Sequence, residues 1–360
     1  MSTARAAPIY TSTIEGALQG LLEEAPGIPL RPSDRVVILS DLHLGDGGTR
    51  DDFRHNSGLV HHALRDYYLD RGFSLVLNGD IEELQRFRYH AIRDTWAGLL
   101  SLFSQFRTHT ALYRVLGNHD ESLPTAAEES EGPFLRAVRF LVDGGTLFVF
   151  HGHQATIFFE RFNGVSGFFL RHVANRLRIP NVPVMYESRK KYLTEHRVYA
   201  FSSTRKVVSI IGHTHRPLFE SLSKIDTLRF RIEQLCRDHS LASPQARKVI
   251  ETAISSCRAE LERLWEKDRQ NGLRSSLYSE HLSIPCLFNS GCAIGKRGFT
   301  AVEIGGGQIA LVHWFDRLRG ERHMSEDGRS AERLGATSYY RAVLKEDRLQ
   351  YVFTRIRLLT

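Results

Sequence analysis

Cysteines and long apolar runs are both scarce in this sequence of 360 residues. The four cysteines lie in the C-terminal part without a CxxC pair, at Cys236, Cys257, Cys286 and Cys292. This pattern argues against a disulfide framework and a thiolate zinc site, and it indicates a reducing compartment such as the cytoplasm. No apolar run reaches the roughly 18 residues that a membrane span needs. The N-terminus lacks a basic stretch followed by an apolar run, which disfavours export.

Acidic side chains are outnumbered, 41 against 48 basic ones, and the excess is local. Residues 154–206 hold ten basic and three acidic side chains, so their net charge of +7 equals that of the whole chain. Such a charge indicates an anionic partner, for example a phosphorylated substrate or a lipid headgroup. The chain is 42% hydrophobic and 25% charged, as globular proteins are, and its length allows one large or two ordinary domains.

Five short apolar runs each end in polar residues that can bind a metal. They cover residues 35–40, 72–77, 110–116, 146–150 and 206–211. Such runs predict buried strands, and the helical spacing in residues 59–71 and 84–106 predicts helices between the first three. The N-terminal half is therefore predicted to have a β-α-β-α-β order with a largely buried sheet. Ligands of such sheets bind outside the carboxyl ends of the strands.

Carboxylates, an amide and imidazoles follow these five runs. The seven candidate metal ligands are Asp41, His43, Asp80, Asn118, His151, His213 and His215. Residues two apart in an extended chain project to the same side, so Asp41 and His43 can reach one point. Oxygen and imidazole ligands suit Mn²⁺, Fe or Zn²⁺ better than Ca²⁺. Two ions about 3.5–4 Å apart need a shared carboxylate and several further ligands, and the seven candidates are enough for that.

The order of these motifs resembles the calcineurin-like metallophosphoesterases. The matching segments, between residues 36 and 217, are DLH (41–43), NGD (78–80), GNHD (117–120), HGH (151–153) and GHTH (212–215). The resemblance implies an α/β fold with a two-sheet β-sandwich flanked by helices and helical insertions. It also implies two divalent metal ions, with Mn²⁺ expected first and Fe or Zn²⁺ as alternatives. One ion would be held by Asp41, His43 and His215 and the other by Asn118, His151 and His213, with Asp80 bridging them.

The expected reaction is hydrolysis of a phosphate or pyrophosphate ester by hydroxide activated at the metals. The leaving oxygen needs a proton, and His119, next to a metal ligand, is the candidate general acid. Asp120 is the candidate that orients His119, and a role as a helix N-cap or turn residue is an equal alternative. His153 is interpreted as lying behind the metal ligands.

Residues 154–206 provide the sequence evidence about the substrate, because aromatic and basic side chains are interleaved in this segment. This segment resembles the helical cap of the UDP-2,3-diacylglucosamine pyrophosphatases, so a lipid-linked or nucleotide-linked substrate at the membrane surface is one hypothesis. The candidate substrate-binding residues are Phe168, Phe169, Arg171, Arg176, Arg178 and Arg216. Peripheral contact with the inner face of the membrane would use residues 156–178. An amphipathic helix that packs on the sheet is the alternative interpretation.

Two features depart from that branch, which usually has GNRD where this chain has GNHD and lacks a helical pair at 225–268. A phosphoprotein phosphatase, or a phosphodiesterase or nuclease with an open basic site, is therefore the alternative function. A non-enzymatic interaction module is a remote one. No specific nucleic-acid motif is present, and the sequence leaves the oligomeric state open.

The predicted organisation has five parts. They are an N-terminal extension (1–32), a first core part (33–220) with the basic and aromatic cap at about 154–206, an inserted helical hairpin (221–280), a second core part (281–320) and a C-terminal extension (321–360). The second core part is expected to contribute strands at 283–288, 298–304 and 308–314, the last two joined by a glycine turn.

Overall fold

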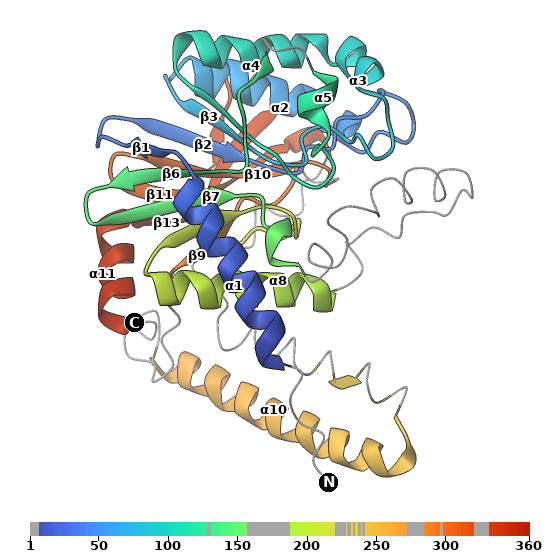
Figure 1. The fold of residues 1–360 in the computed structure, drawn as a ribbon, viewed down its shortest axis with the longest axis vertical. Coiled ribbons are helices and arrows are strands. Elements are labelled where there is room, and N and C mark those ends of the chain that lie inside the picture. Colours follow the sequence, from blue (N-terminus) through green and yellow to red (C-terminus); the bar gives the residue numbers. More distant parts are fainter. Residues whose placement is uncertain are drawn as a thin grey trace.

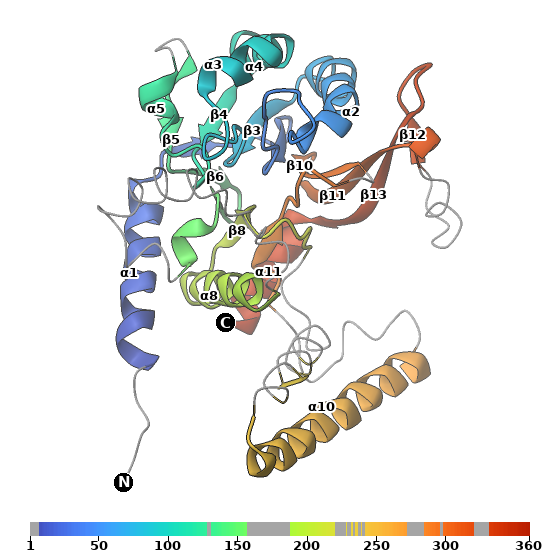
Figure 2. The same cartoon turned by 90° about the vertical axis from the view of Figure 1, so that its right-hand side faces the viewer.

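Two β-sheets form the centre of the molecule in the computed structural model (Figure 1). The structure describes residues 7–127, 131–156, 188–219, 228, 232, 235, 236, 239, 242–271, 284–295, 298–319 and 331–360. Helices cover the outer faces of both sheets (Figures 1 and 2). This arrangement confirms the predicted fold class, a two-sheet α/β sandwich flanked by helices.

The larger sheet has eight strands, and its parallel half contains three of the predicted ones. In spatial order they are β12 (Ala331–Arg333), β13 (Tyr339–Arg348), β11 (Gln308–Asp316), β10 (Phe299–Gly305), β2 (Arg35–Leu39), β3 (Ser74–Asn78), β4 (Leu112–Val115) and β5 (Phe134–Leu135). Strands β2 to β5 run parallel, so β2, β3 and β4 end at the same edge. Strands β10, β11, β13 and β12 continue the sheet in antiparallel pairs.

The smaller sheet has five strands. In spatial order they are β1 (Gly27–Pro29), β6 (Ala137–Val142), β7 (Gly145–Phe150), β8 (Val208–Ile211) and β9 (Leu287–Asn289). Strands β7, β8 and β9 are parallel. Sequence reasoning predicted β7, β8 and β9 but not β1 or β6, which adds an antiparallel neighbour to β7.

The alternation of side chains along β2 shows that the larger sheet is packed on both of its faces. Val36 and Ile38 are buried in the cluster between the two sheets, together with Val149 of β7. Val37 and Leu39 point the opposite way, into a separate cluster under the helices. Because successive residues of a strand face opposite sides, a run that is apolar throughout belongs to a sheet covered on both faces. The sequence RVVIL therefore requires packing layers above and below it.

The helices divide between the two outer faces. The larger sheet is covered by α2 (Ser57–Ala63), the π-helical η2 (Leu64–Leu69), α3 (Tyr89–Thr95) and α4 (Ala97–His109), and the smaller one by α1 (Ala7–Glu24) and α8 (Ser188–Arg205). The remaining short segments are η1 (Phe53–His55), α5 (Leu123–Ala126), η4 (His153–Ala155) and η8 (Arg317–Arg319). The helix predicted over 84–106 is interrupted at Trp96, whose indole N–H donates to Gly45 O over 3.0 Å.

Both ends of the chain join the core, although sequence reasoning treated them as extensions. β1 pairs with β6, and β13 pairs with β11 along its whole length. Helix α11 (Leu349–Leu359) buries Val352 and Phe353 in the cluster between the sheets. The segments are therefore part of the sandwich, and the limits of the five predicted parts stay predictions.

Helix α10 (Pro244–Asn271) corresponds to the second helix of the predicted hairpin. Most residues of the first helix lie outside the described residues, although Leu228 is described and is buried beside Cys257 and Leu261 of α10. Within the described part of the chain, no helix combines the length and apolar character that a membrane crossing needs.

One buried polar network joins a helix to the antiparallel half of the larger sheet. The hydroxyl of Tyr68 donates to Glu303 Oε1 over 2.7 Å and accepts from the Trp314 indole over 2.8 Å. Arg341 of β13 donates through Nε to the same Glu303 oxygen over 2.9 Å. Glu303 is 7% exposed, so the removal of its carboxylate would leave several buried donors without an acceptor.

We expect Glu303→Ala to lower the free energy of unfolding by about 3–5 kcal/mol, because a buried charge pair loses one partner. The control is Asp52→Ala, which removes an exposed pair with Arg86 and should cost less than about 1 kcal/mol. Urea denaturation followed by circular dichroism measures both. Equal losses in the two variants would contradict a structural role for the network.

Candidate metal centre

The predicted metal ligands lie where strands of both sheets end. Asp41 and His43 follow β2, Asp80 follows β3, Asn118 and His119 follow β4, His151 follows β7, and His213 and His215 follow β8. Parallel strands end at one edge, and the stacked sheets place their two edges side by side. Seven of these residues form three overlapping groups, each with ligand atoms within 4.8 Å of one another. The clusters of histidine and aspartate could therefore hold metal ions.

The first group is Asp41, His43 and His215. Nε2 of His215 lies 3.0 Å from Asp41 Oδ1 and 3.2 Å from His43 Nε2. His43 Nε2 lies 3.9 Å from the same Asp41 oxygen. Three ligand atoms from two different sheets thus face one point.

The second group is Asp80, His151 and His213. His151 Nδ1 donates to Asn78 O over 2.9 Å, which leaves Nε2 as the free lone pair, 3.1 Å from Asp80 Oδ2. Asp80 also forms the third group, with His43 and His119. Its carboxylate therefore lies between the first group and the second.

The backbone at this edge adopts an uncommon conformation. Among the described residues, six non-glycine residues have positive φ, and five of them belong to the groups: Asp41 (54°), His43 (52°), Asp80 (53°), His213 (64°) and His215 (55°). Each such residue costs about 1–3 kcal/mol and persists only where the surrounding structure holds it in place. The left-handed turns direct consecutive motif residues into the site instead of along the strand.

Two motif glycines allow the site residues to approach the backbone. A Cβ atom on Gly117 would lie 2.2 Å from Asp80 Oδ1, and one on Gly212 would lie 2.5 Å from Asp41 Oδ2. Within two residues of each glycine, a backbone N–H donates to the same carboxylate: His119 N to Asp80 Oδ1 over 2.8 Å, and His213 N to Asp41 Oδ2 over 3.0 Å. The glycines therefore let the loops close onto Asp80 and Asp41.

Several ligand atoms lack a partner that their burial requires. Asp41 Oδ1 and Asn118 Oδ1 are buried and accept no hydrogen bond from the described residues. An unsatisfied buried oxygen costs about 1–3 kcal/mol, so such atoms are rare unless an ion or water pairs with them. The donor set therefore fits divalent metal ions, and Asn118 fits as an oxygen ligand.

Glu83 is a site residue that sequence reasoning missed. Its Oε2 accepts from His43 Nδ1 over 2.9 Å and its Oε1 from His119 Nδ1 over 2.8 Å. Burial would raise the pKa of Glu83, but the two hydrogen bonds and the charges of His119 and His43 together lower it to about 2. Both imidazoles thus carry their proton on Nδ1 and present Nε2 to the site. Its place three residues after Asp80 was the only available signal.

His119 lies at the edge of the site, with its ring 4.8 Å from that of His43 and its side chain 20% exposed. Nε2 is 3.9 Å from Asp80 Oδ2. Burial alone would lower the pKa of His119, but the charge of Asp80 and the hydrogen bond to Glu83 raise it to about 9.

Asp120 does not orient His119, which corrects the interpretation made from sequence. Its two oxygens accept backbone N–H groups of Ile81 (2.7 Å) and Gly117 (2.6 Å), and Glu83 occupies the place beside His119 Nδ1. Burial and the charge of Asp80 raise the pKa of Asp120 to about 7. Asp120 holds the loops after β3 and β4 together, as its alternative role as a turn residue implied.

The candidate substrate-binding residues are placed only in part. Phe168, Phe169, Arg171, Arg176 and Arg178 lie outside the described residues, so the cap interpretation stays a prediction. Arg216 is described and donates through Nε to Glu195 Oε1 over 3.2 Å. His153 is buried with its ring 5.4 Å from that of His151, behind the second group.

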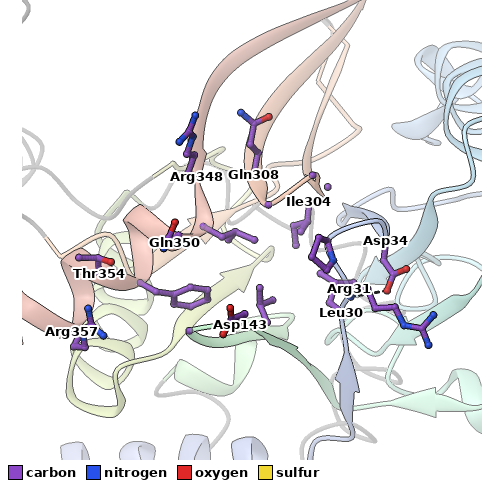
Figure 3. Close-up of a pocket in the computed structure, with 18 residues that line it drawn as sticks. Leu30, Arg31, Asp34, Asp143, Ile304, Gln308, Arg348, Gln350, Thr354 and Arg357 are labelled. Atoms are coloured by element: carbon purple, nitrogen blue, oxygen red, sulfur yellow. Dashed lines mark hydrogen bonds between the residues drawn. The ribbon is translucent and has the colours of Figure 1, made fainter.

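A cavity of about 770 Å³ lies at the opposite edge of the sheets (Figure 3). It is lined by the segment before β2, the turn between β6 and β7, the glycine turn between β10 and β11, and the start of α11. These are the edges where β2 and β7 begin, whereas the metal groups lie where β2 and β7 end. None of the candidate site residues lines this cavity.

The comparisons with known proteins found similarity among solved structures but not among family models or curated proteins. No protein-family model matches the sequence, and no curated protein matches it. Among solved structures, the chain is similar to a conserved uncharacterized protein of Streptococcus pneumoniae TIGR4 that is described as a predicted phosphoesterase. The sequence identity is 11%, the match covers 79% of this chain and 91% of that one, and the TM-score is 0.30.

We expect Glu83→Gln to weaken Mn²⁺ binding by roughly 10–100-fold, since the imidazoles lose the carboxylate that orients them. The control is Glu121→Gln, an exposed position close to the same loop. Isothermal titration of each metal-free variant with Mn²⁺ gives the affinities. An unchanged affinity in Glu83→Gln would show that the carboxylate does not support the metal ligands.

Proposed function

We propose that this protein hydrolyses phosphate esters with two divalent metal ions. One ion is assigned to Asp41, His43 and His215, the other to Asn118, His151 and His213, and Asp80 is shared by both. The observation that carries the proposal is the convergence of His43 Nε2, His215 Nε2 and Asp41 Oδ1 beside the Asp80 carboxylate. Mn²⁺ suits this mixture of oxygen and imidazole ligands, and Fe or Zn²⁺ are alternatives. When bound, such ions activate water and neutralise charge on phosphoryl oxygens.

The protein's own residues supply orientation and a proton. The Glu83 carboxylate accepts from His119 Nδ1 over 2.8 Å, which directs Nε2 of His119 towards the metal groups. Because His119 is partly exposed at the edge of the metal groups, Nε2 is positioned to donate its proton to the leaving oxygen. The strained turns at Asp41 and Asp80 hold the ligand atoms in place before substrate arrives.

The substrate is proposed to be amphipathic, on the support of the basic and aromatic composition of residues 154–206. An interaction module has no physical need for five strained residues and unpaired buried oxygens at one point, which favours an enzyme over a scaffold. Phosphoprotein, phosphodiester and nucleotide-lipid substrates all offer the phosphoryl group that the site would take.

With Mn²⁺ present, we expect the wild-type protein to hydrolyse at least one of a nucleotide-lipid, a phosphodiester and a phosphoprotein. Asp80→Ala should hydrolyse none of them and should bind fewer ions per chain, because the shared carboxylate is lost. Asp94→Ala, at an exposed position on α3, is the control and should behave as wild type. Metal content by plasma mass spectrometry together with product release measures both effects. Full metal content and activity in Asp80→Ala would refute the assignment.

His119→Ala should retain both metal ions and lose rate by roughly 10²–10⁴-fold on an alkyl phosphate. The loss should be much smaller on 4-nitrophenyl phosphate, whose leaving group needs no proton. Steady-state kinetics on the two esters give the comparison, and metal content confirms that the site is intact. Equal rate losses on both esters would argue against His119 as the acid.

A further inference from the structure

Helix α8 is attached directly to the loop that carries His213 and His215. Glu195 of α8 is fully buried, and its Oε1 accepts from Thr214 Oγ1 over 2.8 Å and from Arg216 Nε over 3.2 Å. Thr214 stands between the two histidines in sequence. The position of α8 is therefore coupled to the position of two proposed metal ligands.

The same polar network reaches the smaller sheet. Asn289, at the end of β9, donates through Nδ2 to Thr214 Oγ1 over 2.9 Å and to Gly212 O over 3.0 Å. Glu195, Thr214 and Asn289 are all buried, so a displacement of α8 would leave polar groups unsatisfied. The network holds the N-terminal half of α8 beside the metal groups.

Lys191 lies one helical turn before Glu195, on the same face of α8. Its side chain is half-buried, which lowers the pKa of the ammonium. The nearby carboxylates of Glu195 and Asp41 oppose that shift, and the thiol of Cys292 also lies nearby. Cys292 belongs to the loop after β9 that is tied to the first metal group, since Ala293 N donates to Asp41 O over 3.1 Å. The ammonium of Lys191 is thus within electrostatic range of Asp41 on the side of the site covered by α8.

Among the described residues, no carboxylate contacts the ammonium of Lys191 directly. Glu195 is bonded to Thr214 and Arg216, and Lys191 forms no ion pair with a carboxylate in the described part of the chain. A half-buried ammonium loses part of its hydration, and a fixed anion beside it would compensate for that loss. This position therefore favours an anionic group of the substrate.

We propose that Lys191 binds the phosphoryl group beside Asp41 and makes the protein prefer phosphate monoesters to diesters. The proposal rests on the proposed phosphoesterase function. A monoester carries two negative charges near neutral pH and a diester carries one. Because the Coulomb energy is proportional to the product of the charges, one fixed ammonium stabilises the bound monoester more strongly than the diester.

The test uses Lys191→Met, which keeps most of the aliphatic chain and removes the charge. Lys206→Met is the matched control, an exposed lysine just beyond the other end of α8. We expect Lys191→Met to lower the ratio of kcat/KM for 4-nitrophenyl phosphate to that for bis(4-nitrophenyl) phosphate about tenfold, mainly through KM. Lys206→Met should leave the ratio unchanged, and Lys191→Arg should restore most of it.

Binding of inorganic phosphate to the Mn²⁺-loaded protein is the second readout. Isothermal titration should show about tenfold weaker phosphate binding in Lys191→Met and wild-type binding in Lys206→Met. An unchanged ester ratio with unchanged phosphate affinity overturns the role of Lys191 and leaves the phosphoesterase function standing. If the wild type cleaves neither ester, the proposed function is the one that fails for these esters, and phosphate binding still decides whether Lys191 recognises the anion.

Discussion

The carboxylate of Asp80 is the contact on which the arrangement of the site depends. One of its oxygens accepts the backbone N–H of His119, and the other lies 3.1 Å from His151 Nε2. Gly117 must be a glycine for the loop after β4 to approach this carboxylate. A single side chain at the end of β3 thus positions a loop of its own sheet and faces a histidine of the other sheet. Any shift between the sheets would separate these groups.

Two buried glutamates fix the positions of residues around the proposed metal ligands. Glu83 holds the imidazoles of His43 and His119 in one orientation, and Glu195 attaches α8 to the loop of His213 and His215. Each carboxylate bonds two groups that are far from it in sequence. Because buried charges are costly unless they are paired, these contacts resist small rearrangements of the site. Rigidity of this kind suits chemistry in which ligand atoms must be in place before substrate binds.

Much of the fold could be predicted, because the five apolar runs, such as residues 35–40, each end in a polar motif that marks the end of a strand. Edge elements were missed for a local reason. β1 has three residues and no recognisable period, and β6 alternates only partly. The interruption at Trp96 could not be predicted either, since the spacing of apolar residues continues through it while the indole bonds to Gly45. The sequence left two roles open for Asp120, because its nearness to His119 in sequence does not show which groups its oxygens face.

The sequence alone determined the types of residue at each strand end, their order along the chain and hence the kind of metal that could bind. These properties are local, because the end of an alternating or apolar run in the sequence marks the end of a strand. Only the tertiary structure decided that Glu83 joins His43 to His119 and that Glu195 attaches α8 to the loop of His213 and His215. The reason is physical: distances between segments far apart in sequence are set by how the sheets and helices pack. No periodicity within a segment encodes them.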